Sequence, residues 1–564
     1  MQKWLFALLV GLMALPGAFS ARTLAQSDSP VRVVLAMDAP GNLDPASLSR
    51  FDTPTRDLVE NLFIGLTRFN ARTGQVDPWL AQSWTVSPDG LTWTFQLRED
   101  VQWVRVDPTT GTAETLRPVV AADVVFAVHR ACDPERPSPV TDNLYVVAGC
   151  RTVTNPNTLE TFDLDQTVGI RALDETTLEI QLMFPNAGFL TMTTLPEFRP
   201  LPAELINDSI QPALRPDTLV TSGPWVVESW MVGQSMRLIR NPFWPDDYAG
   251  NVEVIEVTFS LAAEAVVAQF GAGAVDVMRL QAGHPALAQL PSERLRHADG
   301  PTLTLLGFSF NNQNVEGAPV PSPLDLPEVR RALALAIDRE ALAAQVLGQA
   351  AEAADHFTPL TVIAAPSAPG ATFDARAAQR SLAQAGYASC ASLGQLTLAV
   401  GPEPLELQIA QFIVGQWQTH LACPAEVFPV VQVPRRALID SAHNTVDVAE
   451  ASRYPLWLLY WSADYPDAQA WIADALHCGY GYFRVGRGCG PADQLLDQAG
   501  RAADLRTRFT TYNQVETEFF GVLGSFPVIP LAMDQRWWVQ AERLQGVANY
   551  GPFQFDRWSN AETP

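Results

Sequence analysis

Lysine is almost absent from this chain of 564 residues. Of its 37 basic residues, Lys3 is the single lysine and all the others are arginines. If export removes the first residues, chemistry that needs a lysine amine, such as a Schiff base or a Walker-type phosphate loop, is excluded. Acidic residues outnumber basic ones by 61 to 37, and the resulting net charge of −24 argues against general affinity for nucleic acid or an anionic membrane surface.

Short catalytic and metal-binding motifs are also missing. The sequence contains no CxxC, no HExxH and no GxSxG, and no two of its seven histidines stand four residues apart. The glycine-rich stretch 479–490 lacks the lysine and the spacing of a phosphate loop, so we interpret it as a surface loop closed by a disulfide. We therefore expect no metal, no cofactor and no enzymatic activity, and a secreted hydrolase is a remote alternative.

Long apolar runs are confined to the amino terminus. After Lys3, the run from Trp4 to Leu15 has about a dozen residues, which suits a signal peptide and is short for a membrane span. Residues 1–25 are therefore predicted to be a signal peptide, cleaved after Ser20 or Ala25, and a retained anchor is the alternative. No cysteine near these positions could carry a lipid. We expect a secreted protein, periplasmic or on the exterior of the cell envelope.

Apolar residues are plentiful in the rest of the chain. Hydrophobic residues make up 47% and charged residues 17%, which is too apolar for a disordered chain, and the length predicts at least two domains. The chain has six cysteines, and an even number of cysteines in an exported protein indicates disulfide bonds. They allow 15 pairings, of which the simplest joins sequence neighbours. These pairs are Cys132–Cys150, Cys390–Cys423 and Cys478–Cys489.

Alternating apolar residues predict strands. An opening strand is expected at 31–37, and a hairpin at 84–97, where Trp93 and Phe95 fall on the buried face. Further strands are expected at 178–182 and 252–259.

Helical periodicity alternates with these strands. The clearest helix is predicted at 327–347, with Asp325 as its N-cap and Glu328 as the capping-box partner. Arg330, Arg331 and Arg339 are expected mostly off its apolar face. Further helices are expected at 374–385 and 492–504. Strands that alternate with helices predict an α/β protein.

A series of short segments stands in a characteristic order in the first half of the chain. Residues 42–46 read NLDPA, 80–84 read LAQSW, 89–98 read DGLTWTFQLR and 122–126 read ADVVF. An insertion around 104–116 separates the last two.

The series continues in the second half. Residues 222–225 read SGPW, 240–244 read RNPFW, 329–339 read VRRALALAIDR and 461–467 read WSADYPD. In this order the segments resemble those of the extracytoplasmic solute-binding proteins of ABC importers, family 5, which bind oligopeptides, dipeptides or nickel. The resemblance covers nearly the whole mature chain.

The resemblance implies a fold. This is the α/β periplasmic-binding-protein type II fold (cluster C), with two lobes joined by a hinge and an extra domain on the first lobe. The expected division is lobe I at 31–66, 200–297 and 525–564, the extra domain at 67–199, and lobe II at 298–524. The chain would then cross between the lobes near 297 and near 525, and the lobes would close on a ligand.

The resemblance also implies a receptor for di- or oligopeptides, which delivers them to the permease subunits of an ABC transporter. A bound peptide would pair with strand segments through its main chain. Asp464 matches the aspartate that pairs with the peptide α-ammonium, and the alternative is that Asp464 caps a turn before Pro466.

Further ligand positions follow from the same resemblance: Tyr460, Ser462, Trp461, Arg50 and Phe51. The first two would supply main-chain groups, Trp461 would wall a side-chain pocket, and the last two would lie on the opposite edge. Leu458 stands where longer-peptide binders place an arginine for the peptide carboxylate. Without lysine, that anchor must be an arginine, a histidine or a backbone nest.

Other ligands fit the same fold. An oligosaccharide, a nickel chelate or another polar solute is the alternative to a peptide, and the 15 tryptophans would suit stacking on sugars. We expect a monomer with no nucleic-acid partner.

Overall fold

The computed structural model describes the chain from residue 30 to residue 561. Within that span the description leaves out 50–51, 71, 108, 156–161, 205–218, 260–261, 281–284, 311, 314–318, 444–452, 484–485 and 548–550. The predicted signal peptide, residues 1–25, lies outside the described residues.

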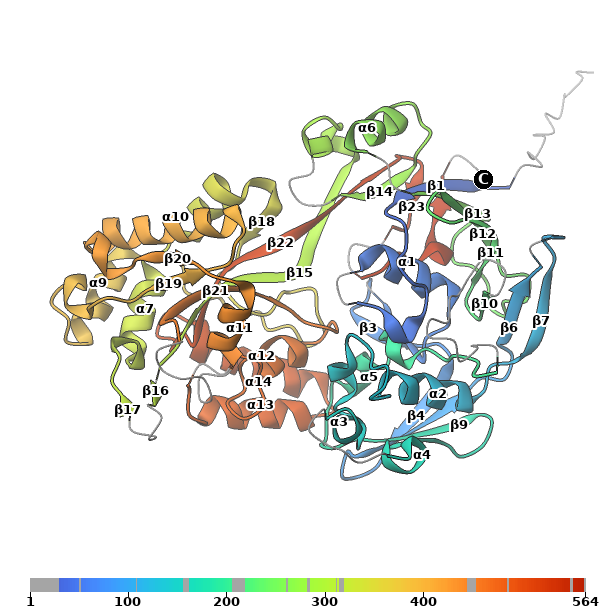
Figure 1. Cartoon of the computed structure of the whole chain (residues 1–564), viewed down its shortest axis with the longest axis horizontal. Coiled ribbons are helices and arrows are strands. Elements are labelled where there is room, and N and C mark those ends of the chain that lie inside the picture. Colours follow the sequence, from blue (N-terminus) through green and yellow to red (C-terminus); the bar gives the residue numbers. More distant parts are fainter. Residues whose placement is uncertain are drawn as a thin grey trace, which may run out of the picture.

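One eleven-stranded sheet runs through the molecule. Its order is β11-β12-β13-β1-β14-β22-β15-β21-β19-β20, and β18 pairs with β22. The bounds are β11 Trp225–Met231, β12 Ser235–Arg240, β13 Val254–Phe259, β1 Arg32–Met37, β14 Val277–Leu280, β22 Val528–Gln540, β15 Leu295–Phe308, β21 Leu456–Ser462, β19 Leu398–Val400, β20 Val430–Gln432 and β18 Ala351–Ala353. Figure 1 shows the long strands β15 and β22 running side by side between two bodies.

Two large hydrophobic cores correspond to these bodies. The core of the first body comes mainly from 33–280 together with 538–558, and the core of the second body comes from 303–533. The longer helices on the sheet and around it are α1 Thr53–Leu62, α2 Ala121–Ala131, α6 Ala263–Gly271, α7 Pro327–Leu335, α9 Ala375–Gln384, α10 Pro404–His420, α11 Arg435–His443, α13 Pro491–Arg501 and α14 Leu505–Phe520.

The predicted strands of the first body are confirmed. β1 pairs in parallel with β13 and β14, in the centre of the large sheet. The predicted hairpin is β4 Ala81–Val86 and β5 Thr92–Leu97, which extend into a four-stranded sheet with β9 Thr177–Gln181 and β8 Ile170–Ala172. Trp93 and Phe95 are buried, as the alternation predicts. The insertion around 104–116 forms the hairpin of β6 Gln102–Val106 and β7 Ala113–Pro118.

The long helix predicted at 327–347 is wrong in two respects. α7 ends at Leu335, and Asp338 then caps a separate short helix, α8 Arg339–Leu342, by accepting a hydrogen bond from the Ala341 amide at 2.9 Å. A capping side chain inside the apolar pattern offers the backbone a new start, which ends the first helix. Asp325 is not the N-cap of α7, because its carboxylate accepts the Ser322 amide at 2.8 Å in the preceding turn.

Arg330 and Arg339 were predicted to lie off the apolar face, and this is also wrong. Both are buried, at 3% and 4% exposure. Their guanidinium groups donate to backbone carbonyls: Arg330 to Phe526 at 3.0 Å, and Arg339 to Pro530 at 2.7 Å. Each arginine satisfies carbonyl groups at or beside the start of β22, which would otherwise lack partners.

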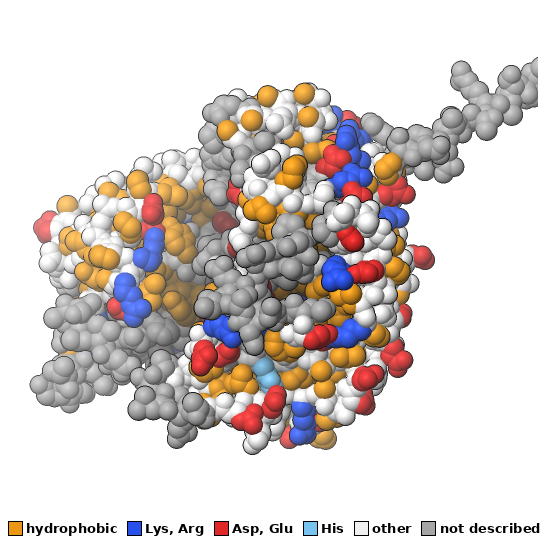
Figure 2. Space-filling view, turned by 45° about the vertical axis from the view of Figure 1, so that its right-hand side comes forward, with side chains coloured by type: hydrophobic (Ala, Val, Ile, Leu, Met, Phe, Trp, Pro, Cys, Tyr) orange, Lys and Arg blue, Asp and Glu red, His pale blue; other side chains and the backbone are white. Residues whose placement is uncertain are grey.

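The six cysteines form the three predicted pairs. Cys132–Cys150, Cys390–Cys423 and Cys478–Cys489 are all disulfide-bonded. Among the described residues, no helix combines the length and the apolar character needed to cross a membrane. Figure 2 shows acidic side chains spread over the surface of the first body, with arginines among them.

Candidate functional site

A cavity of about 490 Å³ lies where the two bodies meet. The first body lines it with the end of β1, the start of α1, part of β14 and the stretch 551–554. Ser462 at the end of β21, the segment 463–466 after it, and residues 534–537 of β22 also line the cavity. The cavity therefore receives residues from segments that are far apart in the sequence.

Two of the predicted ligand residues lie in this cavity. Ser462 ends β21, where it pairs with Thr302 of β15, and the two hydroxyl oxygens are 2.9 Å apart. Asp464 follows two residues later and also lines the cavity. The strand end thus brings main-chain groups and a carboxylate to the same wall.

The other predicted residues lie elsewhere. Tyr460 is 37% exposed on β21 beside Arg435, whose guanidinium carbon is 5.6 Å from the ring centroid. Trp461 packs against Tyr482 and Phe483, each with ring centroids 5.5 Å away. Neither belongs to the cavity lining.

Three further positions bear on the predicted ligand contacts. Leu458 is fully buried in the core of the second body. Arg50 and Phe51 are outside the described residues.

Asp464 stands among buried acids. Burial raises the pKa of Glu197 to about 7, and the negative charge of Asp464 adds to this rise while Arg56 opposes it. Burial also raises the pKa of Asp474 to about 7, and the charges of Asp467 and Asp464 again contribute. A cation at Asp464 would offset this concentration of acidic groups.

Two arginines of the lining are held in ion pairs. Arg279 donates to Asp57 at 2.8 Å and lies over the ring of Phe553, 3.7 Å from its centroid. Arg199 pairs with Glu60. These pairs fix the first-body wall, because each partner is locked by a charge-assisted hydrogen bond.

Asp534 is a cavity residue that the sequence analysis missed. It lies on β22 opposite a shift in register, where Asp299 pairs with Gln535 and Leu303 pairs with Met533. Its Oδ1 accepts the Thr302 amide at 2.8 Å, and burial raises its pKa to about 6. No motif marks this position, since its role depends on a bulge between strands more than 200 residues apart.

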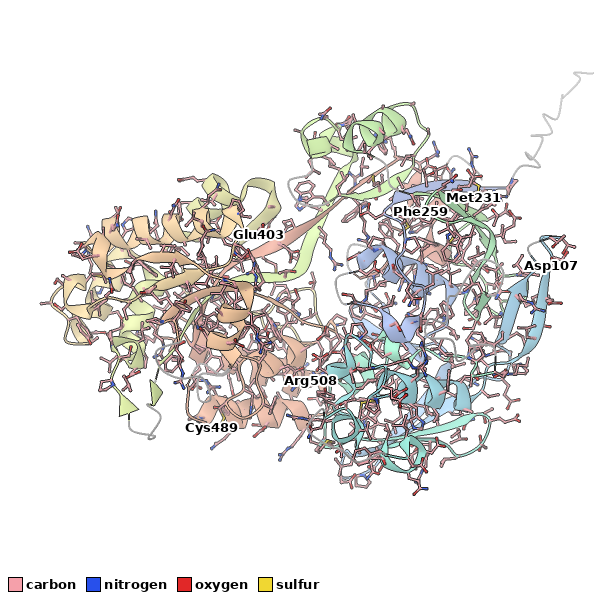
Figure 3. All side chains as sticks on the ribbon, viewed as in Figure 1. Asp107, Met231, Phe259, Glu403, Cys489 and Arg508 are labelled. Atoms are coloured by element: carbon pink, nitrogen blue, oxygen red, sulfur yellow. A yellow bond between two sulfur atoms is a disulfide. The ribbon has the colours of Figure 1, made fainter. Side chains whose placement is uncertain are left out.

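The two bodies also touch away from the cavity. Thr191 donates to Asp467 at 3.3 Å, the Ala187 amide donates to the Gly500 carbonyl at 2.7 Å, and the rings of Phe184 and Tyr480 stack with centroids 6.4 Å apart. Arg508, which pairs with Asp467, lies near this contact in Figure 3. β15 and β22 are therefore not the only connection between the described parts of the bodies.

Comparison with known proteins gives a consistent result. The family model described as bacterial extracellular solute-binding proteins, family 5 Middle, matches residues 75–483. The chain is 27% identical over 558 residues to the probable deoxycholate-binding periplasmic protein YgiS of Escherichia coli, covering 92% of each chain. It is 26% identical to the periplasmic oligopeptide-binding protein OppA of Escherichia coli, covering 85% of this chain and 82% of OppA.

A solved structure shows the fold. The unliganded open form of MppA, a periplasmic murein tripeptide binding protein, matches with a TM-score of 0.76 at 21% identity, over 94% of this chain and 96% of MppA. The predicted α/β type II fold, with two lobes, is confirmed.

Proposed function

The chain belongs to the bacterial extracellular solute-binding proteins of family 5, and we propose on that basis that it is the peptide receptor of an ABC importer. It takes up a di- or oligopeptide in the cavity between the two bodies and delivers it to the permease. The observation that carries the proposal is the wall of the cavity, where Ser462 ends a strand and Asp464 follows it.

The end of β21 suits an extended peptide. A peptide that adds to strand residues through its main chain is held with little regard to its side chains, so such a site accepts many sequences. Its terminus still needs a fixed partner, and Asp464 supplies one for the α-ammonium. An ion pair enclosed in a closing cavity is costly to break, since a buried charge without a partner destabilises by roughly 3–5 kcal/mol.

The long strands support a hinge. We assign lobe I to 31–66, 200–297 and 534–564, its extra domain to 67–199, and lobe II to 298–533. The expected boundary at 525 moves to 533 because residues 526–533 contribute to the core of the second body. β15 and β22 cross between these parts, and their register shifts between Asp299 and Leu303. A bulged pair of strands can bend there while each lobe moves as a unit.

The protein acts by binding alone and as a monomer, outside the cytoplasm. Its relatives are periplasmic binding proteins, which supports that location. Delivery to the permease requires release of an unchanged ligand, so no catalytic step is needed.

The role of Asp464 is tested by peptide chemistry. In calorimetric titrations, Asp464→Asn is expected to lose at least about tenfold in affinity for peptides with a free amino terminus, because the ion pair is gone. N-acetylated peptides should bind weakly to the native protein and be insensitive to the substitution. Asp107→Asn, at the tip of the β6–β7 hairpin in Figure 3, is the matched control. Equal affinity for acetylated and free peptides would refute the ammonium role.

A steroid acid is the second candidate ligand. The likeness to the probable deoxycholate-binding protein YgiS over 92% of the chain favours it, and Arg56 and Arg536 of the lining could meet a carboxylate. A thermal-shift comparison of tripeptides and deoxycholate decides between the two, because a ligand at 100 times its dissociation constant stabilises by about 2.7 kcal/mol.

A further inference from the structure

Asp534 presents a carboxylate to the cavity from the bulge between β15 and β22. Three residues of β15, from Gly300 to Thr302, stand opposite the single residue Asp534. The side chain fills the space that this bulge leaves, since a Cβ on Gly300 would meet its Oδ1 at 2.1 Å. The bulge therefore fixes where the carboxylate points.

The bulge needs one of the two carboxylate oxygens. Oδ1 accepts the Thr302 amide at 2.8 Å. In contrast, Asp57 and Glu60 in the same lining are each paired with an arginine. Burial raises the pKa of Asp534 to about 6, and the charge of Arg536 opposes this rise while that of Asp299 adds to it. The group is thus desolvated and only partly compensated.

Thr302 lies between the Asp534 carboxylate and the strand end that precedes Asp464. Thr302, which donates to Asp534, has its hydroxyl 2.9 Å from that of Ser462. Asp464 is two residues beyond Ser462, which is at most about 7 Å along the chain. Both carboxylates line the same cavity, so an amino-acid residue that carries an α-ammonium and a cationic side chain is offered a partner for each charge.

The net charge of the lining also favours a ligand with an additional positive charge. Among the described residues it holds five carboxylates and four guanidinium groups. The carboxylates belong to Asp38, Asp57, Glu60, Asp464 and Asp534, and the guanidinium groups to Arg56, Arg199, Arg279 and Arg536. A peptide with neutral side chains is a zwitterion and leaves one negative charge in excess, whereas a peptide with one cationic side chain neutralises it.

We propose that Asp534 is a second ligand carboxylate, which selects peptides whose first residue has a cationic side chain, such as lysine. This inference rests on the proposed function, since it takes Asp464 as the partner of the α-ammonium. A lysine ammonium reaches the open oxygen of Asp534, and lobe closure then removes water from a neutral pair. A neutral side chain of the same length leaves Asp534 desolvated and unpaired.

The test compares two tripeptides of equal shape, Lys-Ala-Ala and norleucine-Ala-Ala, by calorimetric titration. The native protein is expected to bind the lysine peptide at least about tenfold more tightly. Asp534→Asn keeps the Oδ1 acceptor for Thr302 and removes the charge. It should therefore bind the two peptides with equal affinity, at an unchanged thermal midpoint.

Each other outcome overturns a defined claim. Equal affinities in the native protein, or an equal loss for both peptides in Asp534→Asn, refute the selective role of Asp534. Binding of neither peptide refutes the proposed function itself. If Asp534→Asn does not fold, Asp534→Ser is the second variant, and retention of the lysine preference in it would refute the proposal.

Discussion

Asp474 is the buried acid with the clearest consequence for stability. It accepts hydrogen bonds from the Tyr465 hydroxyl at 2.9 Å and from Gln469 at 3.4 Å, and burial raises its pKa to about 7. An aspartate in the unfolded chain has a pKa of about 3.9. At a pH between these two pKa values, Asp474 is protonated in the folded protein and ionised in the unfolded chain. This group therefore makes the fold more stable as the pH falls from 8 to 6.

Asp474→Asn should therefore flatten the pH dependence of unfolding. When the pH falls from 8 to 6, the free energy of unfolding of the native protein is expected to rise by on the order of 1 kcal/mol more than that of the variant. Urea titrations at both pH values measure this difference. Asp107→Asn is the control, because backbone hydrogen bonds from Thr109 and Thr110 lower the pKa of Asp107 and keep it ionised throughout. Identical slopes in the native protein and Asp474→Asn would contradict the assignment.

Single residues show where sequence reasoning succeeds and fails. The family resemblance pointed to Asp464 and Ser462 through the contiguous segment 461–467, and both line the cavity. Asp534 was missed because its function depends on a partner strand more than 200 residues away. Arg330 and Arg339 were misplaced, since both donate hydrogen bonds to carbonyl groups of a later segment, 525–530.

Among the elements, the break between α7 and α8 shows how one polar residue divides an apolar pattern. The periodicity continues through 327–347, yet the Asp338 carboxylate accepts the Ala341 amide and starts a new helix. Local capping here overrides a weak helical preference. The pattern alone therefore predicts one helix, whereas in the structure α7 ends at Leu335 and a new helical stretch begins after Asp338, with α8 followed by a π-helical turn at Ala343–Leu347.

Removal of this cap should weaken the second body. Asp338→Ala is expected to lower the free energy of unfolding by about 1 kcal/mol, because the amide groups at the start of α8 lose their acceptor. Asp338→Asn retains an acceptor oxygen, so its free energy of unfolding in the same denaturant titration should remain close to that of the native protein. A neutral effect of the alanine substitution would favour a continuous helix.

For the molecule as a whole, the bulged strands β15 and β22 carry the expected motion. The cavity receives residues from both bodies, so binding of the proposed peptide should bring the lobes together. The radius of gyration, measured by small-angle X-ray scattering, is expected to fall on addition of saturating Lys-Ala-Ala. The radius of gyration of Asp464→Asn should not change at the same peptide concentration. If the native protein binds the peptide and its radius of gyration stays the same, closure is contradicted.

The strands and the disulfides of this fold follow from local patterns, but its connectivity does not. Alternation predicts β1 and the β4–β5 hairpin because each buries one face. The pairing of the Asn61 side chain with the Phe553 carbonyl at 2.7 Å joins positions almost 500 residues apart, and no local pattern contains that information. The division of the chain between two lobes came only from the family resemblance.

That pairing has a consequence for the order of assembly. Asp57 accepts the Phe553 amide, Arg68 pairs with Asp556, and Phe555 and Trp558 are fully buried, so the last described residues complete the core of the first body. Synthesis and export deliver the amino terminus first, and the second body is made from the stretch in between. The part of the protein that is synthesised first is therefore the last to become complete, and it can close only after the whole chain has emerged.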